Sequence, residues 1–155
     1  MKLRLIVLGA KAASWVREAS DDYVRRLPRT VSLEIVELKP EPRDRGVAVE
    51  QLLAAEARRV LAIVQDAWLV ALDERGLAWT TAQFASALAG WRDEAQEVAF
   101  VIGSADGLAI SLREKARVVL SLSAMTLPHA LARVVLIEQI YRATSLLSGH
   151  PYHRE

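Results

Sequence analysis

The chain has 155 residues, of which 52% are hydrophobic and 25% charged, as expected for a globular domain rather than a disordered chain. It contains no cysteine, which excludes a disulfide framework, a catalytic thiol and a thiolate metal site, and its three histidines lack the spacing of a zinc site. With 20 basic and 19 acidic residues the net charge is +1, so any contact with nucleic acid must depend on local patches.

The hydropathy pattern gives no sign of a membrane segment or a targeting signal. No apolar run approaches the roughly 20 residues that a bilayer-spanning helix needs. The first apolar run, residues 2–8, is too short for a signal peptide. We therefore expect one cytoplasmic domain over residues 1–155, with neither a membrane nor a metal ion among its partners.

Strand and helix patterns alternate along the chain. Apolar or alternating runs predict strands at residues 2–8, 32–38, 68–72, 97–102 and 116–120. Apolar residues at helical spacing predict helices at residues 14–27, 47–64, 80–91 and 128–147, with a short helix after residue 111. This alternation is typical of βαβ units, so we expect an α/β fold with a mainly parallel sheet and helices on both faces.

Local signals set some of the boundaries. Thr80 and Gln83 match a capping box, which predicts the start of a helix, and Ser111 and Glu114 match a second one. Residues 73–76 read Asp-Glu-Arg-Gly, which predicts a turn that ends the third strand.

Two polar segments lie in the first third of the chain. In the helix at residues 14–27, apolar residues that include Trp15 recur every four positions, and we expect this face to be buried. Residues 39–46 form a charged loop with two prolines. The loop is either a solvated connector or an arm that contacts phosphate through Arg43 and Arg45.

The last third of the chain predicts a ligand-binding edge. The strands at residues 97–102 and 116–120 run into a loop that begins with Gly103 and into a small-residue turn. Pro128 then opens a long helix, whose N-terminus offers partial positive charge. Because parallel strands end at one edge of a sheet, these loops should border a crevice there.

The long helix at residues 128–147 is apolar around most of its circumference. A helix of this kind is buried on more than one side. In so small a domain the second side is most easily covered by another subunit, so we expect a homodimer.

Polar residues on this helix and behind it are candidates for chemistry. Glu138 and Arg142 have the spacing of an intrahelical ion pair, and a catalytic role is the alternative. His129, in the first helical turn, is either a local hydrogen-bonding group or a neutral base. Residues 148–155 contain two histidines, a tyrosine and an arginine, and when extended they reach roughly 26 Å, enough to cross a crevice or a dimer axis.

Several motifs together resemble a known family. They are Tyr23-Val24-Arg25-Arg26-Leu27-Pro28, Leu72-Asp73 with Gly76, Phe100-Val101-Ile102-Gly103, Leu122-Ser123-Ala124-Met125-Thr126-Leu127-Pro128-His129, Tyr141-Arg142-Ala143 and His150-Pro151-Tyr152-His153-Arg154-Glu155. Over its whole length the chain resembles the ribosomal RNA large subunit methyltransferase H family of the SPOUT, or α/β-knot, methyltransferases.

The resemblance implies a fold, a cofactor and a reaction. The fold would be a SPOUT-type α/β knot with a C-terminal trefoil, and the protein would be an obligate homodimer. The cofactor would be S-adenosyl-L-methionine. The reaction would methylate N3 of a pseudouridine in large-subunit (23S) ribosomal RNA on the assembled ribosome.

The resemblance also assigns residues to the site. The cofactor would be held by Leu72, Gly103, Leu122, Ser123, Ala124, Met125, Thr126 and Leu127. The substrate side, shared between subunits, would be lined by His129, Glu138, Arg142, Tyr152, His153 and Arg154. Arg142 and Arg154 would hold RNA phosphate or a uracil carbonyl, and the proton acceptor would be His153, His129 or Glu138. The family commonly has a second glycine after Gly103, where this chain has Ser104.

Other functions remain open alternatives. A non-catalytic, Rossmann-like dimer that binds a nucleotide or an RNA loop would leave the polar C-terminal segment unexplained. A nicotinamide-dependent dehydrogenase is disfavoured because no G-x-G-x-x-G follows the first strand. A methyltransferase that modifies another ribosomal or transfer RNA base is the nearest alternative among enzymes.

Overall fold

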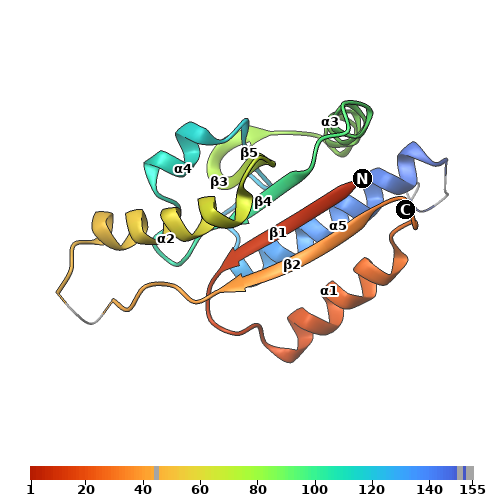
Figure 1. Cartoon of the computed structure of the whole chain (residues 1–155). Coiled ribbons are helices and arrows are strands. Elements are labelled where there is room, and N and C mark those ends of the chain that lie inside the picture. The colour runs from red at the N-terminus through yellow and green to blue at the C-terminus, as the bar shows by residue number, and fades with distance from the viewer. Residues whose placement is uncertain (44–45, 150–151, 153–155) are drawn as a thin grey trace.

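The computed structural model describes residues 1–43, 46–149 and 152. Its elements in chain order are β1 (Lys2–Leu8), α1 (Ser14–Arg26), β2 (Ser32–Leu38), α2 (Val49–Val64), β3 (Trp68–Ala78), α3 (Thr81–Asp93), β4 (Val98–Ile102), α4 (Ile110–Lys115), β5 (Val118–Ser121) and α5 (His129–Leu147). The strands form one five-stranded sheet in the order β2-β1-β4-β3-β5, and every pairing is parallel (Figure 1).

Helices cover both faces of this sheet, as the sequence predicted. Leu3, Leu5 and Val7 of β1 point to the face that carries α1, α3 and α5, whereas Ile6 and Leu8 point to the face of α2 and α4. Strand β4 lies in the middle and is buried along its whole length. Such a strand needs apolar side chains on both faces, which explains its continuous Val-Ala-Phe-Val-Ile sequence.

Strand β3 is longer than predicted, because residues 73–76 do not end it. Leu72 and Leu77 both pair with Leu120 of β5, so the four residues between them form an irregularity and the strand then resumes. A Cβ atom added to Gly76 would lie 2.6 Å from the backbone carbon of Leu120. Only glycine allows this close approach of the two strands.

Two helical details also differ from prediction. Trp15 is 48% exposed, and Val16 and Ser20 occupy the buried positions of α1 instead. The polar side chain of Ser20 can be buried there because its hydroxyl accepts a hydrogen bond from the buried guanidinium of Arg133 on α5 (Nε–Oγ 3.2 Å). Helix α4 begins at Ile110 and has no side-chain cap, so the capping box predicted at Ser111 is wrong.

The capping box at α3 is confirmed. The Gln83 N–H donates to Thr80 Oγ1 (3.2 Å), and the Thr80 N–H donates to Gln83 Oε1 (2.8 Å). We expect Thr80→Ala to lower the free energy of unfolding by about 1 kcal/mol, because a helix-terminal N–H loses its acceptor. Urea unfolding measures this change. Thr80→Ser keeps the acceptor and should stay close to wild type, and equal losses in both variants would contradict the capping role.

Helix α5 is enclosed within its own chain more than the sequence suggested. It packs against α1 and α3 as well as against the sheet, so these helices supply much of its second side. Large apolar side chains that stay exposed on it are Leu131, Leu146 and Leu147. The homodimer and the trefoil knot therefore stay predictions. Within the described residues, no helix is both long and apolar enough to cross a bilayer.

Candidate functional site

A cavity of about 870 Å³ opens at the carboxyl edge of the sheet. The irregular part of β3, the segments that follow β4 and β5, and the first turn of α5 line it, together with residues of α2 and α4. Ligands of open parallel sheets bind at this edge, beyond the strand ends. The predicted cofactor residues that line the cavity are Leu72, Gly103, Leu122, Ser123, Met125, Thr126 and Leu127; Ala124 does not line it.

The cavity combines an apolar lining with a few polar groups. Ile102, Leu108 and Leu120 contribute apolar side chains, and Asp73 and Glu74 contribute carboxylates. Asp73 pairs with Arg113 of α4 (Oδ2–Nη1 3.2 Å), and Glu74 accepts a hydrogen bond from the Thr126 hydroxyl (2.9 Å). These charged residues were not among the predicted site residues, although Asp73 and Glu74 directly follow the predicted strand. The lining is typical of a small-molecule site.

The loop after β4, residues 103–107, forms one wall of the cavity as a tight turn. The Gly107 N–H donates to the Ser104 carbonyl (2.9 Å), and Gly107 has a φ of +84°. A Cβ atom on Gly103 would lie 2.4 Å from the Gly107 carbonyl oxygen. Glycine is therefore required at position 103 by close backbone packing and favoured at 107 by the left-handed conformation.

The loop after β5, residues 122–128, also lines the cavity. Its conformation is held by Ser123, whose Oγ accepts from the Met125 N–H (3.0 Å) and whose carbonyl accepts from the Ser121 hydroxyl (2.9 Å). Met125 is 77% exposed at the rim. His129 also lies at the rim and is exposed, with its Nε2 3.5 Å from the position of a Cβ added to Gly9 at the end of β1.

A second polar group lies further along α5. Glu138 Oε1 accepts from Arg142 Nε (2.8 Å) and from the Tyr152 hydroxyl (3.3 Å). The Tyr152 ring also packs against that of Tyr141 in a tilted arrangement, with ring centroids 4.6 Å apart, and its hydroxyl lies 3.5 Å from that of Tyr23. The intrahelical ion pair is confirmed, and it is joined to the C-terminal segment.

The surroundings of Glu138 shift the pKa values of Arg142 and Tyr152. The hydrogen bond to Glu138 raises the pKa of Arg142. Burial raises the pKa of Tyr152, and its hydrogen bond with Tyr23 and the Glu138 charge raise it further. Tyr152 therefore stays protonated at neutral pH and acts as a hydrogen-bond donor rather than a base.

Among the described residues, the predicted substrate group is divided: His129 lines the cavity with the predicted cofactor residues, whereas Glu138, Arg142 and Tyr152 lie apart from it. Glu138 lies nine residues beyond His129 on α5, a distance of about 13 Å along the helix axis. Neither Glu138, Arg142 nor Tyr152 lines the cavity. His153 and Arg154 lie outside the described residues, so the structure leaves their predicted roles open.

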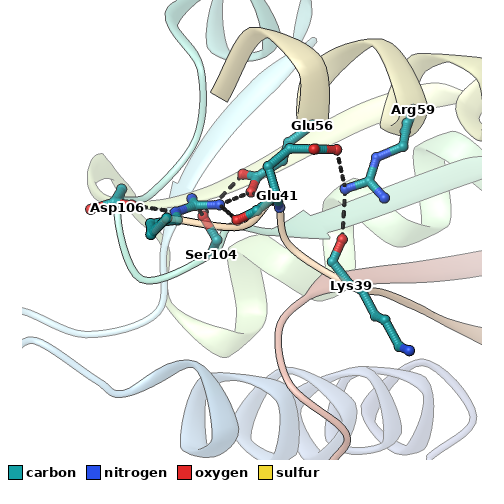
Figure 2. Close-up of polar contacts among 7 residues, drawn as sticks. Lys39, Glu41, Glu56, Arg59, Ser104 and Asp106 are labelled. Atoms are coloured by element: carbon teal, nitrogen blue, oxygen red, sulfur yellow. Dashed lines mark hydrogen bonds and ion pairs between the residues drawn. The ribbon is translucent and has the colours of Figure 1, made fainter. Parts of the chain in front are cut away.

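Sequence reasoning missed a polar network behind the loop at residues 103–107 (Figure 2). Glu56 of α2 is buried and binds Arg43 and Ser104, and Arg43 also binds Asp106. The guanidinium of Arg43 is thus engaged by two carboxylates of the chain itself, which does not support its interpretation as a phosphate-binding arm. Arg45 lies outside the described residues. A signal was available, because Glu56 follows the buried Leu52 by four positions on the apolar face of α2.

Ser104, the departure from the expected family pattern, belongs to this network. Its hydroxyl donates to Glu56 Oε2 (3.0 Å) and accepts from Arg43 Nη2 (2.8 Å). Its side chain is therefore directed at α2. Among the described residues, no group of three or more histidine and acidic side chains has the arrangement of a metal site.

A parallel α/β sheet with a cavity beyond its carboxyl edge defines a class of proteins that bind nucleotide-like ligands. Comparison with known proteins narrows this class. Residues 1–153 match the family model described as predicted SPOUT methyltransferase. The chain belongs to this family and, by the relatives that follow, to its ribosomal RNA large subunit methyltransferase H members.

The similar proteins cover the whole chain. The ribosomal RNA large subunit methyltransferase H of Laribacter hongkongensis is 54% identical over 100% of both chains. The proteins of the same name from Nitrosospira multiformis and Burkholderia cenocepacia are 49% and 48% identical over 99% of each chain. A solved structure of a methylase family protein from Neisseria gonorrhoeae has a TM-score of 0.55 at 15% identity, covering 90% of this chain and 81% of that one, which supports the fold.

Proposed function

We propose that this protein transfers a methyl group from S-adenosylmethionine to N3 of a pseudouridine in large-subunit ribosomal RNA on the assembled ribosome. The observation that carries the proposal is the cavity at the carboxyl edge, which gathers all but one of the residues that the family resemblance assigns to the cofactor. Full-length similarity to ribosomal RNA large subunit methyltransferase H proteins supports the substrate class.

The cavity fits such a cofactor in size and chemistry. Its volume of about 870 Å³ lies within the range of about 300–1,000 Å³ for small-molecule sites. Apolar side chains such as Leu72 and Leu122 would accept an adenine ring, and backbone groups of the loops would bind its edge. Asp73 and Glu74 would balance the positive charge of a sulfonium or an amino group.

The chemistry places few demands on the protein. When bound, the cofactor supplies a methyl group on a positively charged sulfur, which is already electrophilic, so no metal is needed. The protein's own residues align the target nitrogen and accept its proton. Glu138, His129 or His153 would accept this proton. Arg142 and Arg154 would hold RNA phosphate or a uracil carbonyl, and Tyr152 would hold Glu138 in place.

We propose further that the site is completed by a second copy of the chain. The cavity and the Glu138 group occupy different stretches of α5 in one protomer. A symmetric homodimer can bring the cavity of one protomer to the Glu138 group of the other. Exposed Leu131, Leu146 and Leu147 on α5 provide apolar surface for such an interface.

Transfer of labelled methyl from S-adenosylmethionine tests the proposal. The substrates are assembled ribosomes, free large subunits and naked ribosomal RNA, each with the full chain and with a chain lacking residues 152–155. We expect incorporation into assembled ribosomes only, and a loss of at least about a hundredfold on truncation, because the truncation removes groups that hold the substrate and its proton.

Control measurements separate catalysis from binding. Nuclease digestion and mass spectrometry should place the label on a pseudouridine. The truncated chain should bind S-adenosylhomocysteine as the full chain does. Cofactor binding without methyl transfer to any of the substrates would refute the catalytic assignment and favour a non-catalytic RNA-binding dimer.

A further inference from the structure

We propose that Arg43 and Glu56 are positioning residues for the cofactor site: together they hold the loop at residues 103–107 in the shape that the cavity requires. Neither residue touches the reacting atoms. The inference rests on the proposed function only in taking S-adenosylmethionine as the ligand of the cavity.

The guanidinium of Arg43 reaches both sides of the tight turn. Its Nη2 donates to the Ser104 hydroxyl (2.8 Å), and its Nε donates to Asp106 Oδ2 (2.9 Å). Ser104 and Asp106 flank Ala105 in the turn, and all three residues line the cavity. One planar guanidinium therefore fixes two points of a ligand-binding wall, which the single ammonium group of lysine would do less well.

Glu56 anchors this guanidinium to α2. Its side chain is 1% exposed and its Oε1 binds Arg43 Nη1, while its Oε2 accepts from the Ser104 hydroxyl. The Glu41 N–H also donates to Oε1 (2.8 Å). Burial raises the pKa of Glu56, but these hydrogen bonds outweigh burial, so its pKa is lowered and the buried carboxylate stays charged at neutral pH.

The segment that carries Arg43 is itself docked on α2. Arg59 donates to the Lys39 carbonyl (2.6 Å) and pairs with Glu41 Oε1 (3.2 Å), and Figure 2 shows these contacts on the opposite side of Glu41 from Ser104 and Asp106. Arg43 Nη1 also donates to the Glu41 carbonyl (2.6 Å). Arg43 thus connects the segment docked on α2, the buried carboxylate of Glu56 and the cavity wall. An isolated surface ion pair restrains its partners much less than this set of contacts does.

The loop itself supplies limited internal restraint. Its turn is closed by the Gly107 N–H to Ser104 carbonyl bond, and Gly107 has open space around its Cβ position. Without the network, the loop would sample other conformations, and ligand binding would have to select the competent one. The apparent affinity is then the intrinsic affinity multiplied by the fraction of protein in that conformation.

The chain offers a matched control at the opposite edge of the sheet. Arg4, near the start of β1, binds two carboxylates, Glu34 and Glu97 (3.1 Å each), and donates to the Ile63 carbonyl (2.7 Å). Its side chain is 21% exposed, comparable to 30% for Arg43. Arg4→Lys should therefore perturb stability about as much as Arg43→Lys without reaching the cavity.

The test compares wild type, Arg43→Lys, Glu56→Gln and Arg4→Lys by calorimetric titration with S-adenosylhomocysteine. We expect Arg43→Lys and Glu56→Gln to bind about tenfold more weakly or worse, since charged hydrogen bonds that order the loop are lost. In methyl transfer, KM for the cofactor should rise while kcat at saturating cofactor and KM for ribosomes stay unchanged. Hydrogen exchange at residues 103–108 should accelerate in these two variants alone.

The positioning role of Arg43 and Glu56 can be overturned separately from the proposed function. Unchanged affinity in folded Arg43→Lys, with wild type binding normally, would overturn the positioning role and leave the proposed function standing. Equal weakening by Arg4→Lys would also overturn it, because a general loss of stability would then explain the effect. A wild-type protein that binds no cofactor would overturn both proposals. If Glu56→Gln does not fold, Arg43→Lys decides alone.

Discussion

Gly103→Ala is expected to weaken binding of S-adenosylmethionine by roughly a hundredfold, about 3 kcal/mol. The added methyl group would lie 2.4 Å from the Gly107 carbonyl oxygen and 3.0 Å from Leu108 Cγ. Backbone atoms cannot rotate away as a flexible side chain can, so the turn at residues 103–107 must open. Because this turn forms a wall of the cavity, the ligand loses its complementary surface. Calorimetric titration of purified protein measures the loss.

Gly90→Ala is the matched control for this substitution. Gly90 lies within α3, and no heavy atom lies within 4 Å of its added Cβ position. Alanine is favoured over glycine in a helix interior, so this variant should be slightly more stable, by about 0.5–1 kcal/mol, with unchanged ligand affinity. Normal affinity in Gly103→Ala would show that the ligand does not depend on this turn.

Mixing two impaired variants is expected to restore methyl transfer at a cofactor concentration that saturates wild type but not Gly103→Ala. One variant is Gly103→Ala, which damages the cavity, and the other lacks residues 152–155, which damages the Glu138 group. If each site joins the cavity of one protomer to the Glu138 group of its partner, a mixed dimer contains one intact site. Random pairing at equal amounts then gives about a quarter of wild-type activity.

The mixing experiment needs evidence that mixed dimers form. Differently tagged chains can be expressed together and the mixed dimer purified through both tags. Wild-type chains carrying the same tags serve as the control for activity. A purified mixed dimer with no activity would place the whole site within one protomer, and a monomeric protein would exclude the shared site altogether.

Much of the fold could be predicted because burial dictates a visible pattern. The central strand β4 needs apolar residues on both faces, and its sequence shows them without interruption. Strand β3 was cut short because Asp-Glu-Arg-Gly has the composition of a turn. Its continuation depends on pairing with β5 after a backbone irregularity, and such long-range pairing leaves no local signal.

The site was predictable in part for the same reason. Strand ends that precede Gly103 and Leu122 identify the cavity, because parallel strands share one carboxyl edge. The network around Glu56 was missed because its partners are remote in sequence: Arg43 is 13 and Ser104 is 48 positions away. Nothing in either partner's neighbours indicates the contact. The one indication of the network in the sequence is that Glu56 occupies a position on the apolar face of α2.

The order of strands also bears on how the protein folds during synthesis. Strand β1 is an internal strand of the sheet, between β2 and β4, and Leu3 pairs with Val98. The apolar N-terminal strand can therefore complete its pairing only after about two thirds of the chain has been made. Parallel pairing over such long separations is slow, so the apolar and aggregation-prone strand β1 stays exposed during much of the synthesis of the chain. Chaperone contact near the ribosome exit would protect β1 until β4 arrives.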